Sequence, residues 1–260
     1  MCLSKVVFSF DDGRKDNIDV VYPILKKYGI KATFNIATGF IDGTISRKDI
    51  PCDMRAMSVD DLVLLYREGH EIASHSNNHT NNLHDIEIGL KKLRGWLNMN
   101  DNDILGYASP HSLMTIEEAI NTKKWFLKQG ISYVRLGLYE DNIVKKIARK
   151  VAMNFHSKSM FLYAFNDSVS YEKENIYSSV PITRKTTVEQ ILYYVMMRRK
   201  FKKNCILMFH SVKNPNEQLY NDAWTWDACK FDKLCNQISK MQEKKQINIC
   251  TNSQLVRSSI

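Results

Sequence analysis

Three polar groups in the sequence each follow an apolar segment with the composition of a β-strand. Asp11 and Asp12 lie in the segment S-F-D-D-G. His75 and His79 begin and end H-S-N-N-H, and His210 ends the run L-M-F-H. Histidines at i and i+4, with one carboxylate, can bind one ion and leave coordination positions for water and substrate. Adjacent carboxylates repel each other, and an ion bound by one leaves the other free as a base. The pattern therefore indicates a divalent-metal site with a base beside it.

Each group also has a purely structural explanation. The two aspartates could cap the helix that follows, and loop histidines are commonly only solvated. A histidine at the end of a strand can be a buried side chain that the backbone satisfies. In parallel α/β folds, however, active sites gather at the carboxyl ends of strands, where all three groups lie. Their coincidence favours the metal site, with His210 as a general acid that faces it.

Apolar and amphipathic segments alternate along the chain and predict the elements that position these groups. The β-rich segments predict strands over residues 5–10, 31–37, 70–74, 104–108, 131–136, 160–165, 176–180, 205–209 and 247–250. The amphipathic segments predict helices over residues 17–28, 85–97, 116–129, 144–150, 188–200 and 231–243. Ser58 and Asp61 have the spacing of a capping box at the start of a further helix, which Gly69 ends.

This alternation of strands and helices predicts a parallel sheet with right-handed crossovers. About seven or eight strand-plus-helix repeats fit a closed or nearly closed barrel better than a short open sheet. No low-complexity linker or internal repeat divides the sequence. We therefore expect residues 1–260 to form a single domain of the α/β class.

The composition is that of an ordinary globular protein, with 44% hydrophobic and 25% charged residues among 260. No apolar stretch approaches the roughly 18 residues of a transmembrane segment. The segment Met1–Lys5 lacks the basic and apolar regions of a secretory signal, so we expect a cytoplasmic protein. The six cysteines are scattered without a C-x-x-C pair, which indicates reduced thiols rather than a cysteine-bound zinc ion.

The chain has a formal net charge of +9, and its densest basic run is residues 196–203, at the end of a predicted helix. Cations are favourable there because they oppose the helix dipole. Neither a nucleic-acid-binding fold nor interleaved aromatic residues accompany the run, so no nucleic acid is expected as a partner. The charge fits attraction to an anionic glycan, a pyrophosphate-linked sugar or a membrane surface, with peripheral contact, equally well.

The polar groups resemble the motifs of a known family. S-F-D-D-G at 9–13, H-S-N-N-H at 75–79 and L-M-F-H at 207–210 are similar, in chain order, to motifs of the NodB-homology polysaccharide deacetylases, carbohydrate esterase family four. The resemblance implies a distorted (β/α)7-type barrel with parallel strands. It also implies one divalent ion bound by the set Asp12, His75 and His79.

By the same resemblance, Asp11 would be the general base and His210 the general acid. Zinc is the ion expected, although two histidines and an aspartate also accept cobalt, nickel, manganese or iron. In the third family motif, a backbone N–H just after a proline helps to form the oxyanion hole.

That third motif aligns on Y-A-S-P-H at 107–111. Tyr107, Pro110 and His111 would form the oxyanion and substrate loop, with the N–H of His111 as the donor. The family often has an arginine that tethers the base where this chain has Ala108. A subgroup that resembles deacetylases of β-1,6-linked N-acetylglucosamine polymers also has alanine there.

Aromatic residues near the mouth of the barrel could form a platform for a sugar. Tyr107, Trp224 and Trp226 are the candidates, and Leu207 of the L-x-x-H motif is assigned to substrate binding with the two tryptophans. Alternatively, at least one tryptophan packs the C-terminal helix against the barrel. Asp141 lies in the region of the fourth family motif, an Asp/Trp pair, although the local match is poor.

The resemblance implies a metal-dependent hydrolase that removes N-acetyl or O-acetyl groups from an amino sugar, an oligosaccharide or a lipid-linked glycan. Its expected role is in glycan or cell-surface polysaccharide biosynthesis. A deformylase or a cyclic-amide hydrolase would keep the same site with another substrate. A catalytically inactive carbohydrate-binding relative is the third interpretation, which Ala108 and the poorly matched fourth motif motivate.

Overall fold

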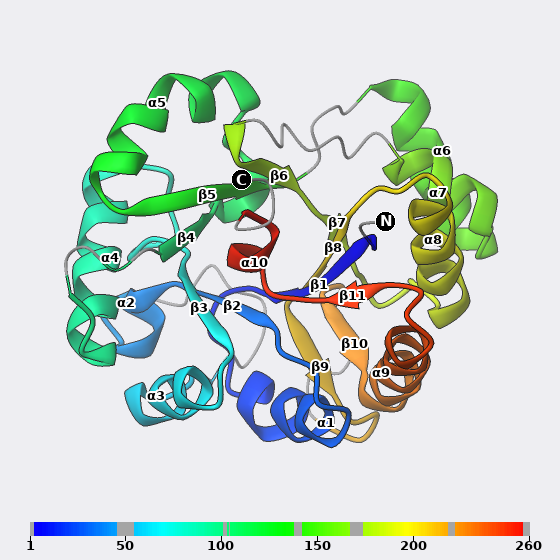
Figure 1. Cartoon of the computed structure of the whole chain (residues 1–260), viewed down its shortest axis with the longest axis horizontal. Helices are drawn as coiled ribbons and strands as arrows, with labels where there is room; N and C mark the ends of the chain where they lie inside the picture. The colour runs from blue at the N-terminus through cyan, green and yellow to red at the C-terminus, as the bar shows by residue number, and fades with distance from the viewer. Residues whose placement is uncertain are drawn as a thin grey trace.

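The computed structural model describes residues 3–45, 55–100, 103, 105–137, 142–166, 174–217 and 222–256. Within these ranges the strands curl around a centre and helices cover their outer side (Figure 1). The strands of the main sheet are β1 (Lys5–Phe10), β2 (Thr33–Ile36), β3 (Glu71–Ser74), β4 (Leu105–Ala108), β5 (Ile131–Leu136), β6 (Ile176–Ser178), β7 (Val180–Pro181), β8 (Cys205–Phe209) and β11 (Asn248–Ile249). A separate parallel pair consists of β9 (Ser211–Lys213) and β10 (Thr225–Asp227).

Helices occupy the connections between the strands. They are η1 (Asn17–Val21), α1 (Tyr22–Lys27), α2 (Thr38–Ile41), α3 (Val59–Arg67), α4 (Leu83–Leu97), η3 (Pro110–Ser112), α5 (Ile116–Lys128), α6 (Ile143–Phe155), α7 (Lys158–Phe165), α8 (Val188–Lys200), α9 (Ala228–Glu243) and α10 (Asn252–Val256). The first of these is a π-helical turn that continues into α1, and η3 is a short 3-10 turn.

The strands of the main sheet follow the order β6-β5-β4-β3-β2-β1-β8-β7, with β11 beside β1. All of these pairs are parallel. The two ends of the path belong to one segment of the chain, because only Ser179 separates β6 from β7. Since β6 pairs with β5 and β7 pairs with β8, the sheet almost closes on itself. The predicted α/β fold, a distorted barrel of parallel strands, is confirmed.

Residues of β1 alternate between two apolar clusters, as the period of a strand requires. Phe8 and Phe10 belong to the main cluster and meet Phe231 of α9 edge-on, so this cluster lies between the sheet and the helices. Phe10 also stacks on Phe34 and Phe209, at ring-centroid distances of 5.2 and 5.3 Å. These rings fix β1, β2 and β8 relative to one another, and the ends of β1 and β8 carry two of the polar groups.

Short α10 closes the amino-terminal end of the barrel, where Figure 1 shows it across the centre. The buried carboxyl group of Glu71 holds α10 there. The two carboxyl oxygens of Glu71 accept hydrogen bonds from the hydroxyls of Thr33 and Tyr133, each at 2.8 Å, and from the N–H of Ser253 at 2.9 Å. Burial raises the pKa of Glu71 above its ordinary value. These bonds therefore attach α10 to β2, β3 and β5 at the amino-terminal end of the barrel.

Most predicted elements are confirmed, and one is wrong. Ser58 and Asp61 form the predicted capping box of α3. The segment 160–165, predicted as a strand, lies in the helix α7. Ser157 caps that helix. The rings of Phe161 and Phe165, four residues apart, pack together with a centroid distance of 4.7 Å. A short apolar run fits a buried strand and a buried helix equally well, and here the cap decides for the helix.

Two further features concern the cysteines and the helices of the described ranges. Cys205, Cys229, Cys235 and Cys250 have free thiols. The remaining cysteines, Cys2 and Cys52, lie outside the described residues. Among the helices of the described ranges, none is long and apolar enough to cross a membrane.

Candidate active site

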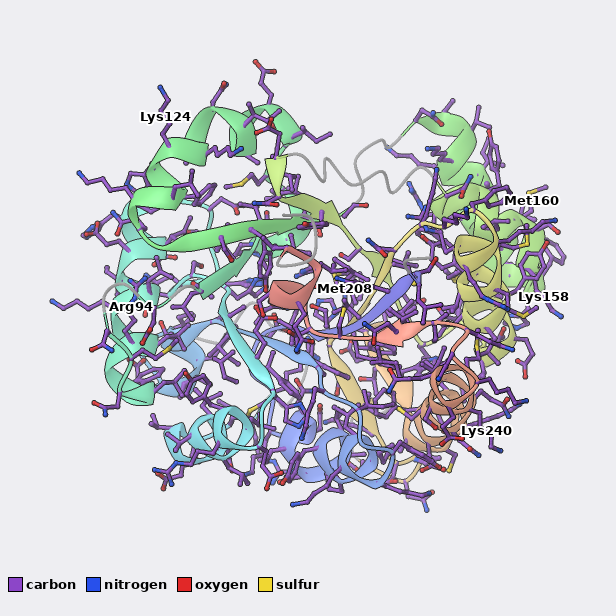
Figure 2. The ribbon with its side chains drawn as sticks, in the orientation of Figure 1. Arg94, Lys124, Lys158, Met160, Met208 and Lys240 are labelled. Carbon is purple, nitrogen blue, oxygen red and sulfur yellow. The ribbon has the colours of Figure 1, made fainter. Side chains whose placement is uncertain are left out.

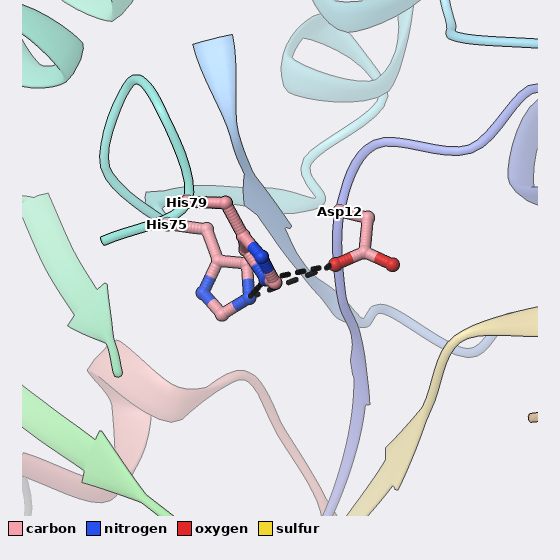
Figure 3. Close-up of side chains that lie close together, drawn as sticks. All are labelled: Asp12, His75 and His79. Atoms are coloured by element: carbon pink, nitrogen blue, oxygen red, sulfur yellow. Dashed lines mark hydrogen bonds and ion pairs between the residues drawn. The ribbon is translucent and has the colours of Figure 1, made fainter. Parts of the chain in front are cut away.

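Asp12, His75 and His79 converge at the carboxyl ends of β1 and β3 (Figure 3). Oδ1 of Asp12 lies 3.7 Å from Nε2 of His75 and 3.4 Å from Nε2 of His79. The two imidazole nitrogens are 3.1 Å apart. One ligand atom from each residue therefore points at a common centre, with all three within 4.8 Å of one another.

These separations fit a single metal ion. Bonds of about 2.0–2.2 Å place neighbouring ligands of a tetrahedral ion about 3.3–3.6 Å apart. In addition, Oδ1 of Asp12 is buried and has no hydrogen-bond partner among the described residues. A buried carboxylate oxygen without a partner is costly unless it binds a cation. The donor set and its geometry therefore suit a divalent ion, as expected from the sequence.

The two loops that carry these side chains contain residues with left-handed backbone conformations. Asp12, Ser76 and His79 have φ angles of 80°, 63° and 59°. Each such non-glycine residue costs about 1–3 kcal/mol. Neighbouring elements hold the loop in place, because the N–H of Thr38 donates to the carbonyl of Ser76 at 3.0 Å. The strain is concentrated where the two loops turn their side chains toward each other.

Further contacts orient two of the ligands. Nδ1 of His75 lies 2.8 Å from the carbonyl oxygen of Ala108, which can only accept, so Nδ1 carries the proton and Nε2 keeps its lone pair for a metal. The guanidinium of Arg14 donates to Oδ2 of Asp12 at 2.9 Å and leaves Oδ1 directed at the histidines. Arg14 also reaches Asp222, at 3.5 Å.

The site keeps its ligands in the protonation states that a metal requires. Burial, reinforced by the neighbouring His75, lowers the pKa of His79 to about 3, and burial also lowers the pKa of His75. Burial alone would raise the pKa of Asp12, but Arg14 and the nearby imidazoles hold it below its ordinary value. Two neutral imidazoles and one carboxylate are therefore present at neutral pH, ready to bind a cation.

Asp11 precedes Asp12 of the candidate metal site and is held by both of its oxygens. Oδ2 accepts from Arg135 at 2.7 Å, and Oδ1 accepts from the side-chain amide of Asn35 at 2.8 Å. Arg135 is itself anchored by the hydroxyl of Ser179 at 2.9 Å. Burial alone would raise the pKa of Asp11, but Arg135 and the imidazoles of His75 and His210 outweigh it and lower that pKa. Asp11 is thus an oriented, ionised carboxylate.

Arg135 and Asn35 are not among the site residues predicted from the sequence. Arg135 is the register partner of Ala108 on the neighbouring strand. It therefore brings a guanidinium to Asp11 from the strand next to the position where the resembled family often has its tethering arginine. The signal was present, because Arg135 and Asn35 each interrupt an otherwise apolar strand, and a charged residue is rarely fully buried unless it is paired.

His210 lies directly after β8, next to both aspartates. The N–H of Asp11 donates to the carbonyl of Phe209 at 3.0 Å, and the side chain of Asn17 donates to the carbonyl of His210 at 2.8 Å. Burial lowers the pKa of His210, while the charges of Asp12 and Asp11 oppose that effect. The imidazole ring lies 4.6 Å from that of Trp224, between centroids.

The loop after β4 also reaches the site. Pro110 is buried in η3, and the exposed His111 has a φ of 53°, with its ring 4.2 Å from the ring of His79. Tyr107 has a different place from the one proposed for a sugar platform. Its ring is 0% exposed and its hydroxyl donates to Asn81 at 2.8 Å, so it offers no face to a substrate.

Two residues assigned to substrate binding are core residues. Leu207 is 0% exposed in the middle of β8. Trp226 is 1% exposed, donates from Nε1 to the carbonyl of Thr186 at 2.9 Å and packs against Phe209, as the alternative interpretation expected for one tryptophan. Trp224 is 38% exposed beside His210 and remains a candidate for stacking on a sugar. Asp141 lies outside the described residues.

The start of α4 supports the loop that carries the two histidines. Asp85 accepts from the N–H of Asn78 at 2.9 and 3.0 Å and from the hydroxyl of Thr80 at 2.9 Å. One turn later, α4 passes so close that a Cβ on Gly89 would lie 2.8 Å from the carbonyl carbon of Ser76 and 3.0 Å from its oxygen. The position of the loop therefore depends on the absence of a side chain at Gly89.

We expect Gly89→Ala to destabilise the fold by about 1–3 kcal/mol and to weaken metal binding, because the obstructing atoms are backbone and cannot move without the loop. Gly95→Ala on the same helix is the matched control, since nothing lies within 4 Å of its added Cβ. That control should be neutral or stabilising by about 0.5–1 kcal/mol. Denaturant unfolding and zinc titration of both variants test this, and equal behaviour would contradict it.

A parallel barrel with a two-histidine, one-aspartate centre and a held carboxylate beside it has the organisation of a metal-dependent hydrolase. One family of known proteins matches the part of the chain that carries this centre. The sequence model described as polysaccharide deacetylase matches residues 3–127, which contain Asp11, Asp12 and both histidines. Residues 3–127, just under half of this chain, therefore have the sequence pattern of the polysaccharide deacetylase family. The search of curated proteins gave no match.

Two solved structures, of 13% identity each, share the fold of this chain. A Mycobacterium smegmatis protein assigned to the polysaccharide deacetylases is 13% identical, with a TM-score of 0.58 over 99% of this chain and 90% of that one. The Bc1960 peptidoglycan N-acetylglucosamine deacetylase is 13% identical, with a TM-score of 0.50 over 97% and 88%. The Streptococcus pyogenes deacetylase PplD is 21% identical over 50% of this chain, with a TM-score of 0.39, and the match spans 54% of PplD.

Proposed function

We propose that this protein is a metal-dependent carbohydrate deacetylase that hydrolyses the N-acetyl group of an amino sugar. The observation that carries the proposal is the convergence of Asp12, His75 and His79, with Asp11 held beside them. Zinc is the ion we propose, because two neutral imidazoles and one carboxylate form its common open site in hydrolases. The bound ion would polarise the acetyl carbonyl and lower the pKa of a water molecule.

The residues around this centre divide the proton transfers. Asp11 is ionised and fixed by Arg135 and Asn35, so it accepts the proton of the attacking water. His210 follows β8, the strand that pairs with β1 next to Asp11, and it protonates the leaving amine. The N–H of His111 is proposed to face the oxygen that becomes negative, since its loop lies against His79. Trp224 is proposed to stack on the sugar.

The substrates that we propose are an acetylated amino sugar, an oligosaccharide or a lipid-linked glycan, in the biosynthesis of a glycan. The free thiols of the described cysteines fit a reducing, cytoplasmic setting for this step. The name of one structural neighbour, a peptidoglycan N-acetylglucosamine deacetylase, supports N-acetylglucosamine as the first sugar to assay. Release of formate instead of acetate would assign the same site to a deformylase.

The metal content of the purified protein tests the central proposal. We expect about one divalent ion per chain by elemental analysis, and loss of that ion in the double variant His75→Ala/His79→Ala, since two of the three ligands are removed. Zinc added to the stripped protein should restore both the metal content and acetate release from N-acetylchitooligosaccharides.

His84→Ala is the matched control, because His84 lies at the start of α4 outside the ligand set. This variant should keep its metal. A wild-type protein that takes up no ion, even with excess zinc or cobalt, would contradict the proposed metal centre. Glycan binding without turnover by such a protein would assign it as a carbohydrate-binding relative.

A further inference from the structure

The outer helix α6 exposes large apolar side chains along one side. Ile143, Ile147 and Phe155 are 70%, 55% and 77% exposed, and Val144 is 53% exposed. Phe155 and Ile143 are the two most exposed large hydrophobic side chains in the described part of the chain. At 3.6 residues per turn these four residues fall within about a third of the circumference of the helix, so they form a stripe along one side.

Packing within the protein does not require this stripe. The helix packs on α7 and buries its small residues, Ala148 and Ala152, together with Lys145. Figure 1 shows α6 and α7 at the edge of the molecule, beyond α8. An ordinary surface helix turns its large apolar side chains toward the core, whereas α6 turns its alanines inward and its isoleucines and phenylalanine outward.

Cations adjoin the stripe. Lys146 and Lys150 are exposed, and they lie three residues after Ile143 and Ile147, respectively. The segment 142–166, which spans α6 and α7, contains no aspartate or glutamate, and its charged residues are Lys145, Lys146, Arg149, Lys150 and Lys158. In Figure 2, Lys158 and Met160 of α7 point away from the barrel on the same edge of the molecule. An apolar stripe with flanking lysines is the pattern of helices that lie in a membrane interface.

A series of contacts also connects the helix to the candidate active site. It follows β5 at the carboxyl end of the barrel. Near its other end, the carbonyl of Ala152 accepts from Gln190 at 2.8 Å and the side chain of Asn154 accepts from Lys185 at 3.0 Å. Lys185 belongs to the loop after β7.

Neighbouring residues connect that loop to the catalytic centre. The N–H of Arg184 donates to the carbonyl of Ala223 at 3.0 Å, and Trp224, the next residue, packs on His210. Hydrogen bonds of Lys185 and Arg184 therefore connect the end of α6, where the exposed Phe155 follows Asn154, to the segment that carries Trp224.

We propose that the α6 stripe, Ile143, Val144, Ile147 and Phe155 with Lys146 and Lys150, docks the enzyme on the surface of an anionic lipid bilayer. The apolar side chains enter the interface and the lysines contact anionic headgroups. In so far as it concerns substrate, this inference rests on the proposed deacetylase function. Docking through this helix would present an amino sugar that is attached to a membrane lipid, while its lipid stays in the bilayer.

Co-sedimentation of the full chain with vesicles tests the docking. The wild-type protein should sediment with vesicles of an equimolar mixture of phosphatidylcholine and phosphatidylglycerol, and much less with phosphatidylcholine alone. The triple variant Ile143→Gln/Ile147→Gln/Phe155→Gln should lose at least about tenfold in partitioning, because glutamine keeps the helix but not the apolar contact. Lys146→Gln/Lys150→Gln should weaken binding to the mixed vesicles, and added salt should reduce the difference from wild type.

Leu64→Gln/Leu83→Gln removes two exposed leucines elsewhere and should bind as the wild type does. Absence of wild-type binding to the mixed vesicles at low salt, or unchanged binding of the triple variant, would overturn the proposal. A third contrary outcome is a wild-type protein that is a dimer in light scattering and binds no vesicles, with a triple variant that is a monomer. That result would assign the stripe to a second copy of the chain.

Hydrolysis of a soluble N-acetylchitooligosaccharide should be unchanged in the triple variant. Vesicle binding without any deacetylase activity would refute the proposed function but leave the docking surface intact.

Discussion

Asp11→Asn should lower kcat by about 10²–10⁴-fold while the protein retains its metal. The amide cannot accept the proton of the attacking water. It can also accept a hydrogen bond from only one of the two donors, Arg135 and Asn35, that now hold the carboxylate. Some loss of stability therefore accompanies the loss of rate. Acetate release and elemental analysis on the same preparation measure the two effects.

Asp12→Asn is the matched control for this prediction, because it changes the neighbouring residue in the same way. Asp12 carries the oxygen that faces both histidines, so this variant should lose the ion as well as the activity. Together the two variants separate the base from the ligand. Nearly full turnover by Asp11→Asn would show that another group takes the proton.

The convergence of Asp12, His75 and His79 with Asp11 beside them could be predicted from sequence because each residue is local in the chain. Asp11 and Asp12 follow one strand directly, and His75 and His79 lie within a single turn after another. A parallel barrel brings all such strand ends to one face, so order and spacing were enough to predict which side chains meet. His210 was placed at this face by the same argument.

The residues that orient these groups could not be predicted in the same way. Arg135 meets Asp11 only because β5 and β1 face each other across the barrel, and Asn35 only because β2 lies beside β1. Such contacts depend on strand order and register, which no local pattern encodes. The strand predicted over 160–165 failed for a related reason, since an apolar run does not reveal whether the surface that buries it suits a strand or a helix.

Arg135→Met should reduce kcat/KM strongly and shift its pH dependence. The substitution leaves Asp11 buried without the cation that lowers its pKa, so burial dominates and the pKa of Asp11 rises. A base must be ionised to accept a proton, and the acidic limb of the pH–rate profile should therefore move to higher pH. Breaking a buried ion pair by removing one partner also costs about 3–5 kcal/mol of stability. Metal content should be unchanged, because Arg135 contacts none of the three ligands in the described hydrogen bonds and ion pairs.

A variant with the arginine on the neighbouring strand tests whether Arg135 positions Asp11 or only contributes to packing. Ala108 and Arg135 are register partners on adjacent strands, so Arg135→Ala combined with Ala108→Arg moves the guanidinium across one strand spacing and keeps the charge. If the function of Arg135 is to hold Asp11 ionised and oriented, the double variant should recover activity and the original acidic limb relative to Arg135→Ala. Recovery of thermal stability without recovery of the pH profile would instead assign Arg135 to packing alone. Arg135→Lys should fall between these cases, because one ammonium keeps the charge but cannot bridge Asp11 and Ser179 with the planar fork of a guanidinium.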